Sequence, residues 1–137
     1  MVSNQQETEV KIYVRNLAEL QQHLRTIGAE LVQERVFERN IRYDDQYDTL
    51  TDKGVVLRLR HDIITRLTYK APGIIERGIM TREELEVEVS NFDTMEQIIF
   101  RLGYSPAMMY EKYRTTYQVG ETEVMLDELP YGNFIEI

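Results

Sequence analysis

The sequence predicts an α+β fold in which antiparallel strands close into a barrel and helices pack on its outside. Two segments have the periodicity of amphipathic helices, and most of the remaining chain alternates between apolar and polar residues. Charged side chains fill most polar positions of the alternating segments. With 137 residues, the chain fits one domain whose core is large enough to need no covalent cross-links.

Both helices are predicted from residue spacing and caps. Residues 16–28 and 91–103 each place apolar side chains at intervals of three and four, which gives one apolar face. Each segment starts at an asparagine, Asn16 or Asn91, and ends at a glycine, as capped helices do. The two segments match at a constant offset of 75 residues, and each follows an alternating strand. The sequence therefore predicts a duplicated strand–helix unit.

Short turns separate the predicted strands. Strands joined by such turns must pair antiparallel, and breakers that contain glycine or proline lie between several of the alternating segments. The predicted strands are residues 7–14, 32–43, 54–61, 64–70, 84–89, 107–119, 123–129 and 133–137.

Charge is sorted by strand on the polar faces. Arg58 and Arg60 alternate with leucines, whereas Glu84, Glu86 and Glu88 alternate with apolar residues on a later strand. A solvated sheet face is the ordinary explanation for any single strand. Charges nevertheless recur in this way on at least five strands, although like charges close together repel. This repetition favours a barrel with a charged interior, and a barrel of about eight strands can hold one small ligand.

The charged residues suit a chain of phosphates with a divalent metal ion. Basic residues would neutralise a polyanion, and arginine can bind phosphate through two parallel hydrogen bonds. The candidate phosphate-binding residues are Lys11, Arg58, Arg60, Lys70, Lys112 and Arg114. The candidate metal ligands are the carboxylates of Glu7, Glu9, Asp127 and Glu136. Because the chain has no cysteine and only two histidines, these oxygen ligands favour Mg²⁺ or Mn²⁺ over zinc.

Composition argues against several other partners. A net charge of −8 disfavours nucleic acid as an electrostatic partner. The sequence has no run of about 18 apolar residues that could span a membrane, and the polar residues 1–6 lack the apolar centre of a signal peptide. We therefore expect a cytoplasmic protein that binds neither nucleic acid nor membrane. The sequence leaves the oligomeric state open, with a dimer as one option.

The charged motifs follow one another in a recognisable order. The chain opens with Glu7-Thr8-Glu9-Val10-Lys11, a Glu-x-Glu-x-Lys pattern. An arginine strand, a lysine strand, a glutamate strand, a second basic strand and a closing acidic strand follow at residues 54–60, 67–70, 82–89, 111–114 and 126–137. In this order the sequence resembles the CYTH superfamily over essentially its whole length.

The resemblance implies an eight-stranded antiparallel barrel, called a triphosphate tunnel, with helices outside. Members include class IV adenylate cyclases, thiamine triphosphatases and inorganic triphosphatases, all of which handle a triphosphate with a divalent metal. By position, the four candidate carboxylates would serve the metal and the candidate cations would grip the phosphates. Lys70 would orient the attacking water, with Tyr43 as its partner. The supporting carboxylates of the tunnel would be Glu84, Glu86 and Glu88.

Two features depart from the family pattern. The closing strand of the family usually continues as Glu-Ile-Glu and a helix follows it, whereas this sequence stops at Ile137. We therefore expect residues 1–137 to form one CYTH-like domain that lacks the end of its last strand and the helix. No His-Phe pair precedes Glu7, although some class IV cyclases have one, and this difference weakens the cyclase interpretation.

The resemblance and the residues together predict an enzyme that hydrolyses a triphosphate with a divalent metal. The substrate would be inorganic, thiamine or nucleoside triphosphate. The first alternative is a class IV adenylate cyclase that converts ATP to cyclic AMP and pyrophosphate. The second alternative is a non-catalytic module that binds nucleotides or polyphosphate, and it ranks third because the candidate metal carboxylates are present.

Overall fold

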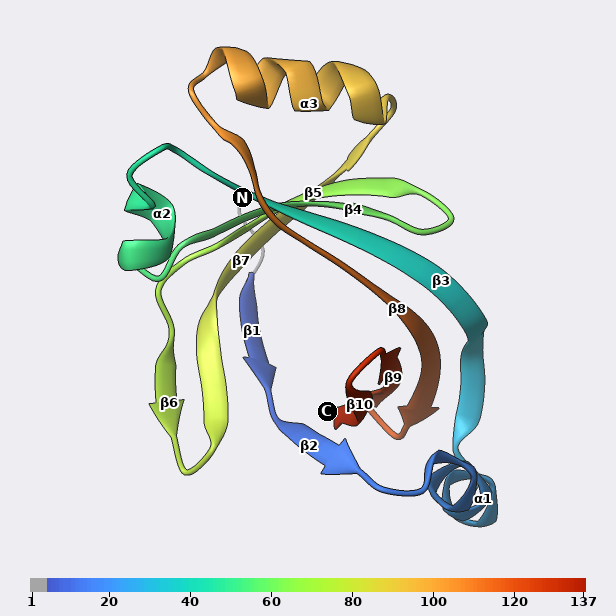
Figure 1. The fold of residues 1–137 in the computed structure, drawn as a ribbon. Helices are drawn as coiled ribbons and strands as arrows, with labels where there is room; N and C mark the ends of the chain where they lie inside the picture. Colours follow the sequence, from blue (N-terminus) through green and yellow to red (C-terminus); the bar gives the residue numbers. More distant parts are fainter. Residues whose placement is uncertain (1–4) are drawn as a thin grey trace. The chain divides into compact units, whose positions relative to one another are not determined.

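Ten strands and three helices make up the part of the chain that the computed structural model describes, residues 5–137 (Figure 1). The first four residues of the polar N-terminal segment lie outside this part. The strands are β1 (Gln6–Glu9), β2 (Lys11–Val14), β3 (Glu30–Asp44), β4 (Val56–His61), β5 (Thr65–Lys70), β6 (Ile74–Glu76), β7 (Ile79–Val89), β8 (Ser105–Val119), β9 (Thr122–Leu129) and β10 (Gly132–Glu136). The helices are α1 (Leu17–Thr26), α2 (Thr49–Asp52) and α3 (Phe92–Arg101).

The chain divides into two compact units. The first holds Arg39–Tyr110 together with the N-terminal segment up to Thr8, and the second holds Glu9–Glu38 and Glu111–Ile137. In the first unit, hydrogen-bonded neighbours follow the order β1-β7-β5-β4-β3, with β6 also paired to β7. In the second unit the order is β8-β9-β10-β2. The pairs β3–β4, β4–β5, β5–β7, β8–β9, β9–β10 and β10–β2 are all antiparallel, as predicted.

The core of the second unit is built around α1. Asn16 caps this helix, because its side chain accepts a hydrogen bond from the backbone N–H of Glu19 at 3.0 Å. Leu24 is the buried residue of the helix. It packs with the buried side chains of Tyr117, Val124, Leu126 and Ile135. The apolar positions of β9 and β10 therefore face α1.

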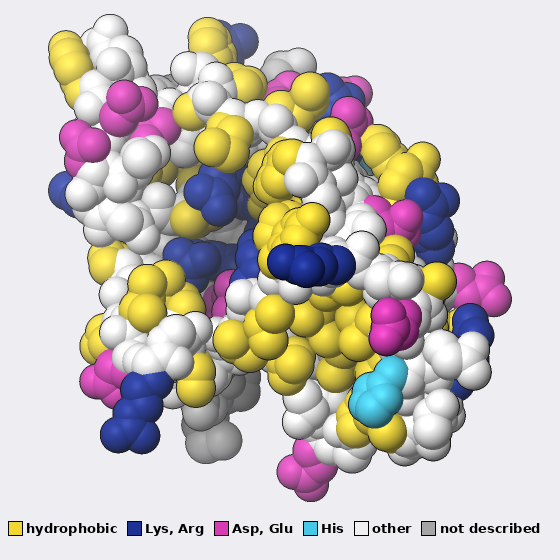
Figure 2. All heavy atoms as spheres, turned by 60° about the horizontal axis from the view of Figure 1, so that its bottom comes forward, with side chains coloured by type: hydrophobic (Ala, Val, Ile, Leu, Met, Phe, Trp, Pro, Cys, Tyr) yellow, Lys and Arg dark blue, Asp and Glu magenta, His cyan; other side chains and the backbone are white. Residues whose placement is uncertain are grey.

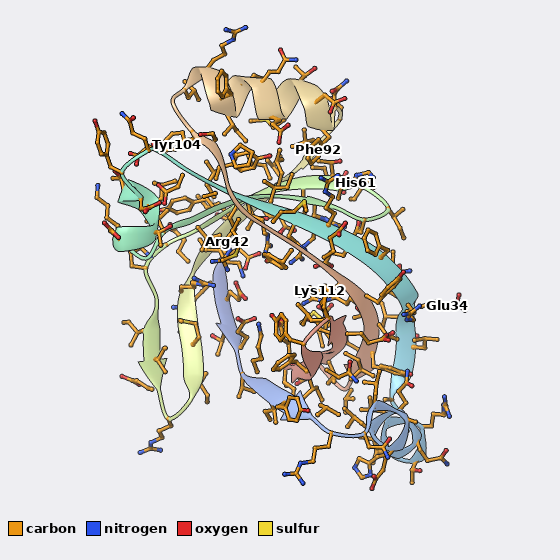
Figure 3. All side chains as sticks on the ribbon, in the orientation of Figure 1. Glu34, Arg42, His61, Phe92, Tyr104 and Lys112 are labelled. Carbon is orange, nitrogen blue, oxygen red and sulfur yellow. The ribbon has the colours of Figure 1, made fainter. Side chains whose placement is uncertain are left out.

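The core of the first unit is built around α3 in the same way. Asn91 accepts a hydrogen bond from the N–H of Thr94 at 2.9 Å. The buried residue of the helix, Ile99, packs with Ile41, Tyr43 and Leu59. Figure 3 shows the two aromatic side chains Phe92 and Tyr104 near opposite ends of α3, and both pack against this core.

The predicted duplication is present in both helices and both cores. Helices α1 and α3 have ten residues each, and strands β3 and β8 have fifteen each. Each of these elements starts 75 residues after its counterpart. Five core positions follow the same offset, namely Val14 with Val89, Leu17 with Phe92, Leu20 with Met95, Leu24 with Ile99 and Ala29 with Tyr104.

The strand count differs from the eight predicted strands for two reasons. The first predicted strand breaks at Val10, because β1 joins β7 in one unit while β2 pairs with β10 in the other. Strand β6 pairs with β7 across a turn in which Arg77 and Gly78 both have positive φ, the geometry of a tight hairpin. Neither difference changes the fold class.

A short helix, α2, follows β3 and was not predicted. The carboxylate of Asp44 accepts hydrogen bonds from the backbone N–H groups of Leu50 and Thr51 at 2.9 Å each. It also accepts one from the Thr51 hydroxyl at 2.6 Å. One buried carboxylate thus fixes a turn too short to show helical periodicity.

The outer surface mixes apolar and charged side chains, and Figure 2 shows a broad gathering of apolar side chains on one face. Large apolar side chains such as Phe37, Ile74 and Phe100 are exposed. Among residues 5–137, no helix has the length and apolar content needed to span a bilayer.

Candidate functional site

The charged positions of the strands are buried on the face opposite the apolar cores. Arg58 is 5% exposed, Lys112 is 6% exposed and Asp127 is 1% exposed. Their strand neighbours Leu59 and Leu126 belong to the apolar cores. Because successive side chains of a strand point to opposite faces, both units carry a buried charged face. Buried charges need partners, and the partners define three groups of residues.

The first group, the Lys70 cluster, consists of Glu7, Lys70 and Glu84. The Nζ atom of Lys70 lies 2.8 Å from one carboxylate oxygen of Glu7 and 3.1 Å from the other. It lies 3.6 Å from Glu84, which is opposite Lys70 in the β5–β7 register. Burial and a hydrogen bond with Glu7 raise the pKa of Glu84 to about 7, against the attraction of Lys70. Glu84 can therefore hold or release a proton near neutral pH.

The second group is a row of side chains that crosses β3, β4, β5 and β7. Arg42 lies opposite Arg58, Arg58 opposite Thr68, and Thr68 opposite Glu86. The Thr68 hydroxyl donates a hydrogen bond to Glu86 at 2.8 Å, and Glu86 lies 4.0 Å from the guanidinium of Arg58. Two arginines directly opposite each other repel, so a structural role alone gives no reason for this pairing.

Three buried guanidinium Nε atoms have no hydrogen-bond partner among the described residues. They belong to Arg42, Arg58 and Arg82 of the first unit. Arg42 lies on β3 (Figure 3) and faces the ring of Tyr110 at 5.9 Å. An unpaired buried donor costs free energy, more so when it is charged. An anion with several oxygens would satisfy such donors.

Two more predicted residues lie beside this row. Arg60 donates from Nε to the side-chain oxygen of Asn40 at 2.8 Å. Arg66 lies opposite Arg60 on one side and opposite Glu88 on the other. Its guanidinium pairs with Asp62 at 3.4 Å and with Glu86 at 3.7 Å. Glu88 itself is exposed, so it contributes less to the buried face than Glu84 does.

The third group, the Asp127 cluster, lies in the second unit and consists of Lys11, Glu38, Lys112, Arg114, Asp127 and Glu136. Arg114 binds both oxygens of Asp127 at 2.7 Å, which is a bidentate pair. Lys112 (Figure 3) donates to Asp127 at 2.8 Å. Burial raises the pKa of Asp127, but the hydrogen bonds and charge of Arg114, aided by Lys112, outweigh it and hold the pKa below its usual value.

Glu136 completes this cluster. It accepts a hydrogen bond from Arg114 at 3.1 Å and an ion pair from Lys11 at 3.0 Å. Its pKa is also lowered, because the attraction of Arg114 and Lys112 exceeds the effect of burial, the largest opposing influence. Glu9 is partly buried and attracts Lys11 in the same unit. Of the four predicted metal ligands, Glu9, Asp127 and Glu136 therefore belong to one unit, and Glu7 belongs to the Lys70 cluster of the other.

Tyr43 is not the partner of Lys70. Its hydroxyl donates a hydrogen bond to Glu96 of α3 at 2.6 Å, and its ring packs in the apolar core of the first unit. Burial and that bond raise its pKa far above the usual range. The correction follows from strand alternation, because Tyr43 lies opposite Leu57 whereas Lys70 lies opposite Val56, one residue out of phase.

The carboxylates fit a hard divalent ion that takes one or two protein oxygens. Asp127 and Glu136 both bind the same guanidinium nitrogen of Arg114, so their oxygens lie close together. Two carboxylates with phosphate oxygens and water are a common Mg²⁺ environment. No three acidic or histidine side chains of residues 5–137 gather tightly enough to hold an ion by themselves. A metal here would need oxygens from a ligand as well.

Three residues of the buried face were missed, namely Glu38, Asn40 and Arg42. They occupy alternate positions of β3, and Glu38 and Asn40 are 1% and 0% exposed. Lys112 lies 3.6 Å from Glu38. Polar residues at every second position from Glu38 onward are a period-two signal of the kind used for the other strands. Apolar residues within the same stretch made that alternation harder to see.

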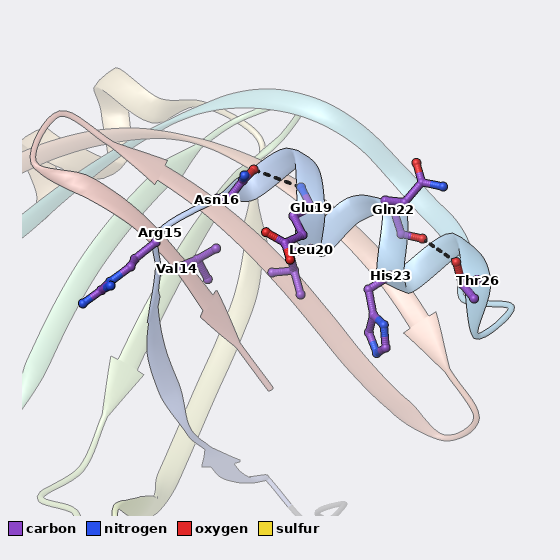
Figure 4. A pocket seen from close by; sticks show the side chains of 8 residues that line it. All are labelled: Val14, Arg15, Asn16, Glu19, Leu20, Gln22, His23 and Thr26. Atoms are coloured by element: carbon purple, nitrogen blue, oxygen red, sulfur yellow. Dashed lines mark hydrogen bonds between the residues drawn. The ribbon is translucent and has the colours of Figure 1, made fainter.

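A groove of about 540 Å³ runs along α1 and contains none of these residues. Figure 4 shows it lined by Asn16, Glu19, His23 and Thr26, with the cap bond of the helix and a bond from Thr26 to the Gln22 carbonyl. Its polar groups are largely satisfied within the helix. The charged clusters are therefore the candidate site.

The chain is similar to known proteins along nearly its whole length. A Methanocaldococcus jannaschii protein provisionally named an adenylate cyclase is 26% identical over 133 residues, which are 96% of this chain and 75% of that protein. A Vibrio parahaemolyticus structure, also provisionally described as an adenylate cyclase, has a TM-score of 0.85 and 25% identity, and the match covers 98% of this chain and 75% of the other.

A third similarity concerns the fold alone. A Hippeastrum protein, provisionally called an adenylyl cyclase and described as having a dominant triphosphatase activity, has a TM-score of 0.70 and 17% identity. The match covers 95% of this chain and 77% of that one.

The family model for the CYTH domain matches residues 5–137. This match and the structural similarities confirm the fold class that the order of charged motifs implied. Members of the family are enzymes that in general depend on a metal and bind triphosphate nucleotides or related substrates. The buried charged faces and the family match lead to one conclusion: this chain belongs to the CYTH family.

Proposed function

We propose that the chain hydrolyses the terminal phosphoanhydride bond of a triphosphate with the help of Mg²⁺ or Mn²⁺. The observation that carries this proposal is the set of buried guanidinium Nε atoms of Arg42, Arg58 and Arg82 without a protein partner. Phosphate oxygens provide several acceptors in a small volume, and guanidinium groups match their geometry. The triphosphatase activity described for the Hippeastrum protein supports the same reaction.

In this reaction a water oxygen forms a bond to the terminal phosphorus, and the bond from that phosphorus to the bridging oxygen breaks. Orthophosphate and the diphosphate product separate, and the water proton is lost. The arginines stabilise negative charge on the phosphate oxygens. The bound metal ion would neutralise the same charge, with Asp127 and Glu136 as its protein ligands and Glu9 beside them.

The Lys70 cluster supplies proton handling. Lys70 stays charged between Glu7 and Glu84 and can donate to a bound water or phosphate oxygen. Glu84, whose pKa is raised to about 7, can accept the proton that the water loses. Geometry therefore offers both a cationic donor and an acceptor for hydrolysis.

The second candidate function is adenylate cyclisation, which the names of the M. jannaschii and V. parahaemolyticus proteins favour. In that reaction the ribose 3′-oxygen of ATP attacks the α-phosphorus, and pyrophosphate leaves. A module that only binds phosphates would form neither set of products.

One incubation separates these functions. The protein is mixed with ATP, thiamine triphosphate or inorganic triphosphate, each with Mg²⁺ or Mn²⁺, and the products are resolved by chromatography. Orthophosphate with the diphosphate product supports the proposal. Cyclic AMP with pyrophosphate supports the cyclase, and binding without products supports the module.

The variant Arg58→Ala tests the site itself. Loss of charged hydrogen bonds should weaken triphosphate binding by about 10- to 100-fold. The matched control is Arg35→Ala, because Arg35 is an exposed arginine that pairs with Glu128. If Arg58→Ala folds and binds triphosphate as well as the unchanged protein, the buried arginines do not form the site.

A further inference from the structure

We infer that the second unit binds a flat heteroaromatic ring carried by the triphosphate, on a surface formed by Tyr13, Tyr131 and Phe134. These three residues are called the aromatic patch below. The inference rests on the proposed function and names the class of its substrate. An organic triphosphate with a planar base, such as a nucleoside triphosphate, would then be preferred over inorganic triphosphate.

The aromatic patch lies on the same sheet face as the Asp127 cluster. Phe134 lies directly opposite Asp127 on β9 and directly opposite Tyr13 on β2. One register step away, Glu136 lies opposite Lys11. Side chains at directly opposed positions share a face of the sheet. The aromatic rings are therefore next to the cations and carboxylates that would hold phosphates and metal.

The rings are arranged with open faces. The centroid of Phe134 lies 5.7 Å from that of Tyr13 and 5.9 Å from that of Tyr131, both edge to face. Tyr13 is 60% exposed and Tyr131 is 74% exposed. Rings with this much exposure bury little apolar area, so they add little to the stability of the fold. The core of the unit lies on the other face, behind Leu126 and Ile135.

Gly132 fixes the position of the Tyr13 ring. A Cβ atom added to Gly132 would lie 3.0 Å from the Tyr13 ring, so the ring passes close over the backbone at this point. The φ of Gly132 is +149°, a conformation that side chains other than glycine rarely adopt. The ring is thus held in place while one side remains open to a ligand.

The spacing suits a nucleotide. Lys11 and Tyr13 are two residues apart on one strand face, which corresponds to about 7 Å. A ribose occupies a gap of similar size between a base and its first phosphate. A base stacked on the patch would therefore leave its phosphates over the charged cluster. Stacking of a base on an aromatic side chain contributes roughly 5- to 100-fold in affinity.

The test compares two ligands that resist cleavage, the imido analogues of ATP and of inorganic triphosphate. Their affinities are measured by calorimetry with Mg²⁺ for the unchanged protein and for Tyr13→Ala, Tyr131→Ala and Tyr13→Phe. We expect the ATP analogue to bind more tightly than the inorganic one. Either alanine variant should remove most of that difference and leave inorganic binding unchanged, whereas Tyr13→Phe should keep it.

The matched control is Ile12→Ala. Ile12 is 50% exposed and lies next to Tyr13 on the opposite face of the same strand. Its replacement should change neither affinity. The inference is overturned if Tyr13→Ala and Tyr131→Ala leave ATP-analogue binding intact, or if they weaken both ligands equally. If the unchanged protein binds neither ligand, the proposed function fails and the inference fails with it. Binding of the inorganic analogue with no gain for ATP overturns the inference alone.

Discussion

Glu84 is held between two acidic side chains and one lysine, and this position couples its proton to folding. Its pKa rises from the ordinary 4.5 to about 7 because it is partly buried, hydrogen-bonded with Glu7 and close to Glu86, despite the nearby Lys70. The folded protein therefore keeps a proton that the unfolded chain has lost. Such a group adds stability that is complete below the unfolded pKa and is lost as pH rises through the folded pKa.

We therefore expect the melting temperature of the unchanged protein to fall between pH 5 and pH 8 relative to that of Glu84→Gln. The glutamine keeps a neutral side chain at every pH and removes this source of pH dependence. Thermal unfolding followed by circular dichroism across this range measures the difference. The control is Glu88→Gln, an exposed position two residues along the same strand face. Parallel profiles for the unchanged protein and Glu84→Gln would contradict the expectation.

Single residues also show how far strand alternation reaches. Alternation placed Arg58, Lys70, Lys112, Asp127 and Glu136 on a buried charged face, which the structure confirms. It could not pair them, because register depends on which strands become neighbours. Tyr43 was assigned by family resemblance against its own alternation, and the structure places it in the apolar core. Residues such as Arg42 and Glu38 lie on the same face and escaped notice because their strand was read for its apolar positions.

At the scale of elements, the matched helices allow a comparison within one chain. Leu24 and Ile99 are the buried residues of α1 and α3 and share no core neighbour. Replacement of either by alanine should lower the free energy of unfolding by about 2–5 kcal/mol, because it removes buried methyl groups and leaves a cavity. The double variant should show the sum within about 0.5 kcal/mol.

Chemical denaturation of the two single variants and the double variant measures these values. The control is Ile98→Ala, because Ile98 neighbours Ile99 but is 46% exposed, and its cost should stay near 0.5 kcal/mol or below. A double variant that costs much less than the sum would show that the two cores are coupled.

The elements that sequence reasoning found are those fixed by local signals. The helices are set by asparagine caps and apolar spacing, and the long strands by alternation. The break at Val10 has no local signal, because it arises from the change of partner between β1 and β2. Strand β6 is three exposed residues with no alternation in burial, and α2 depends on bonds to Asp44. These features follow from tertiary contacts.

At the scale of the whole molecule, the charges of the candidate site are balanced before any ligand arrives. In the Asp127 cluster, Lys11, Lys112 and Arg114 are paired with Glu38, Asp127 and Glu136. A metal ion alone would have to displace cations from the carboxylates, and a triphosphate alone would have to displace carboxylates from the cations. When both bind together, each takes the partners that the other releases.

We therefore expect metal and triphosphate to bind cooperatively. Mn²⁺ should raise the affinity for the imido analogue of inorganic triphosphate by about 5- to 150-fold, and the analogue should raise Mn²⁺ affinity by the same factor. Calorimetry in both orders measures this, after correction for the metal that the free analogue binds. Independent binding of the two ligands would contradict the exchange of partners.

The duplicated strand–helix unit also bears on how the two halves have evolved. Backbone lengths are the same at α1 and α3 and at β3 and β8, but the volumes of matched side chains have diverged. Ala29 stands where the other half has Tyr104, and Leu17 where it has Phe92. Each core is close-packed around its own set of volumes. The halves are thus no longer interchangeable, and a graft of Tyr104 into the position of Ala29 would overfill the smaller core.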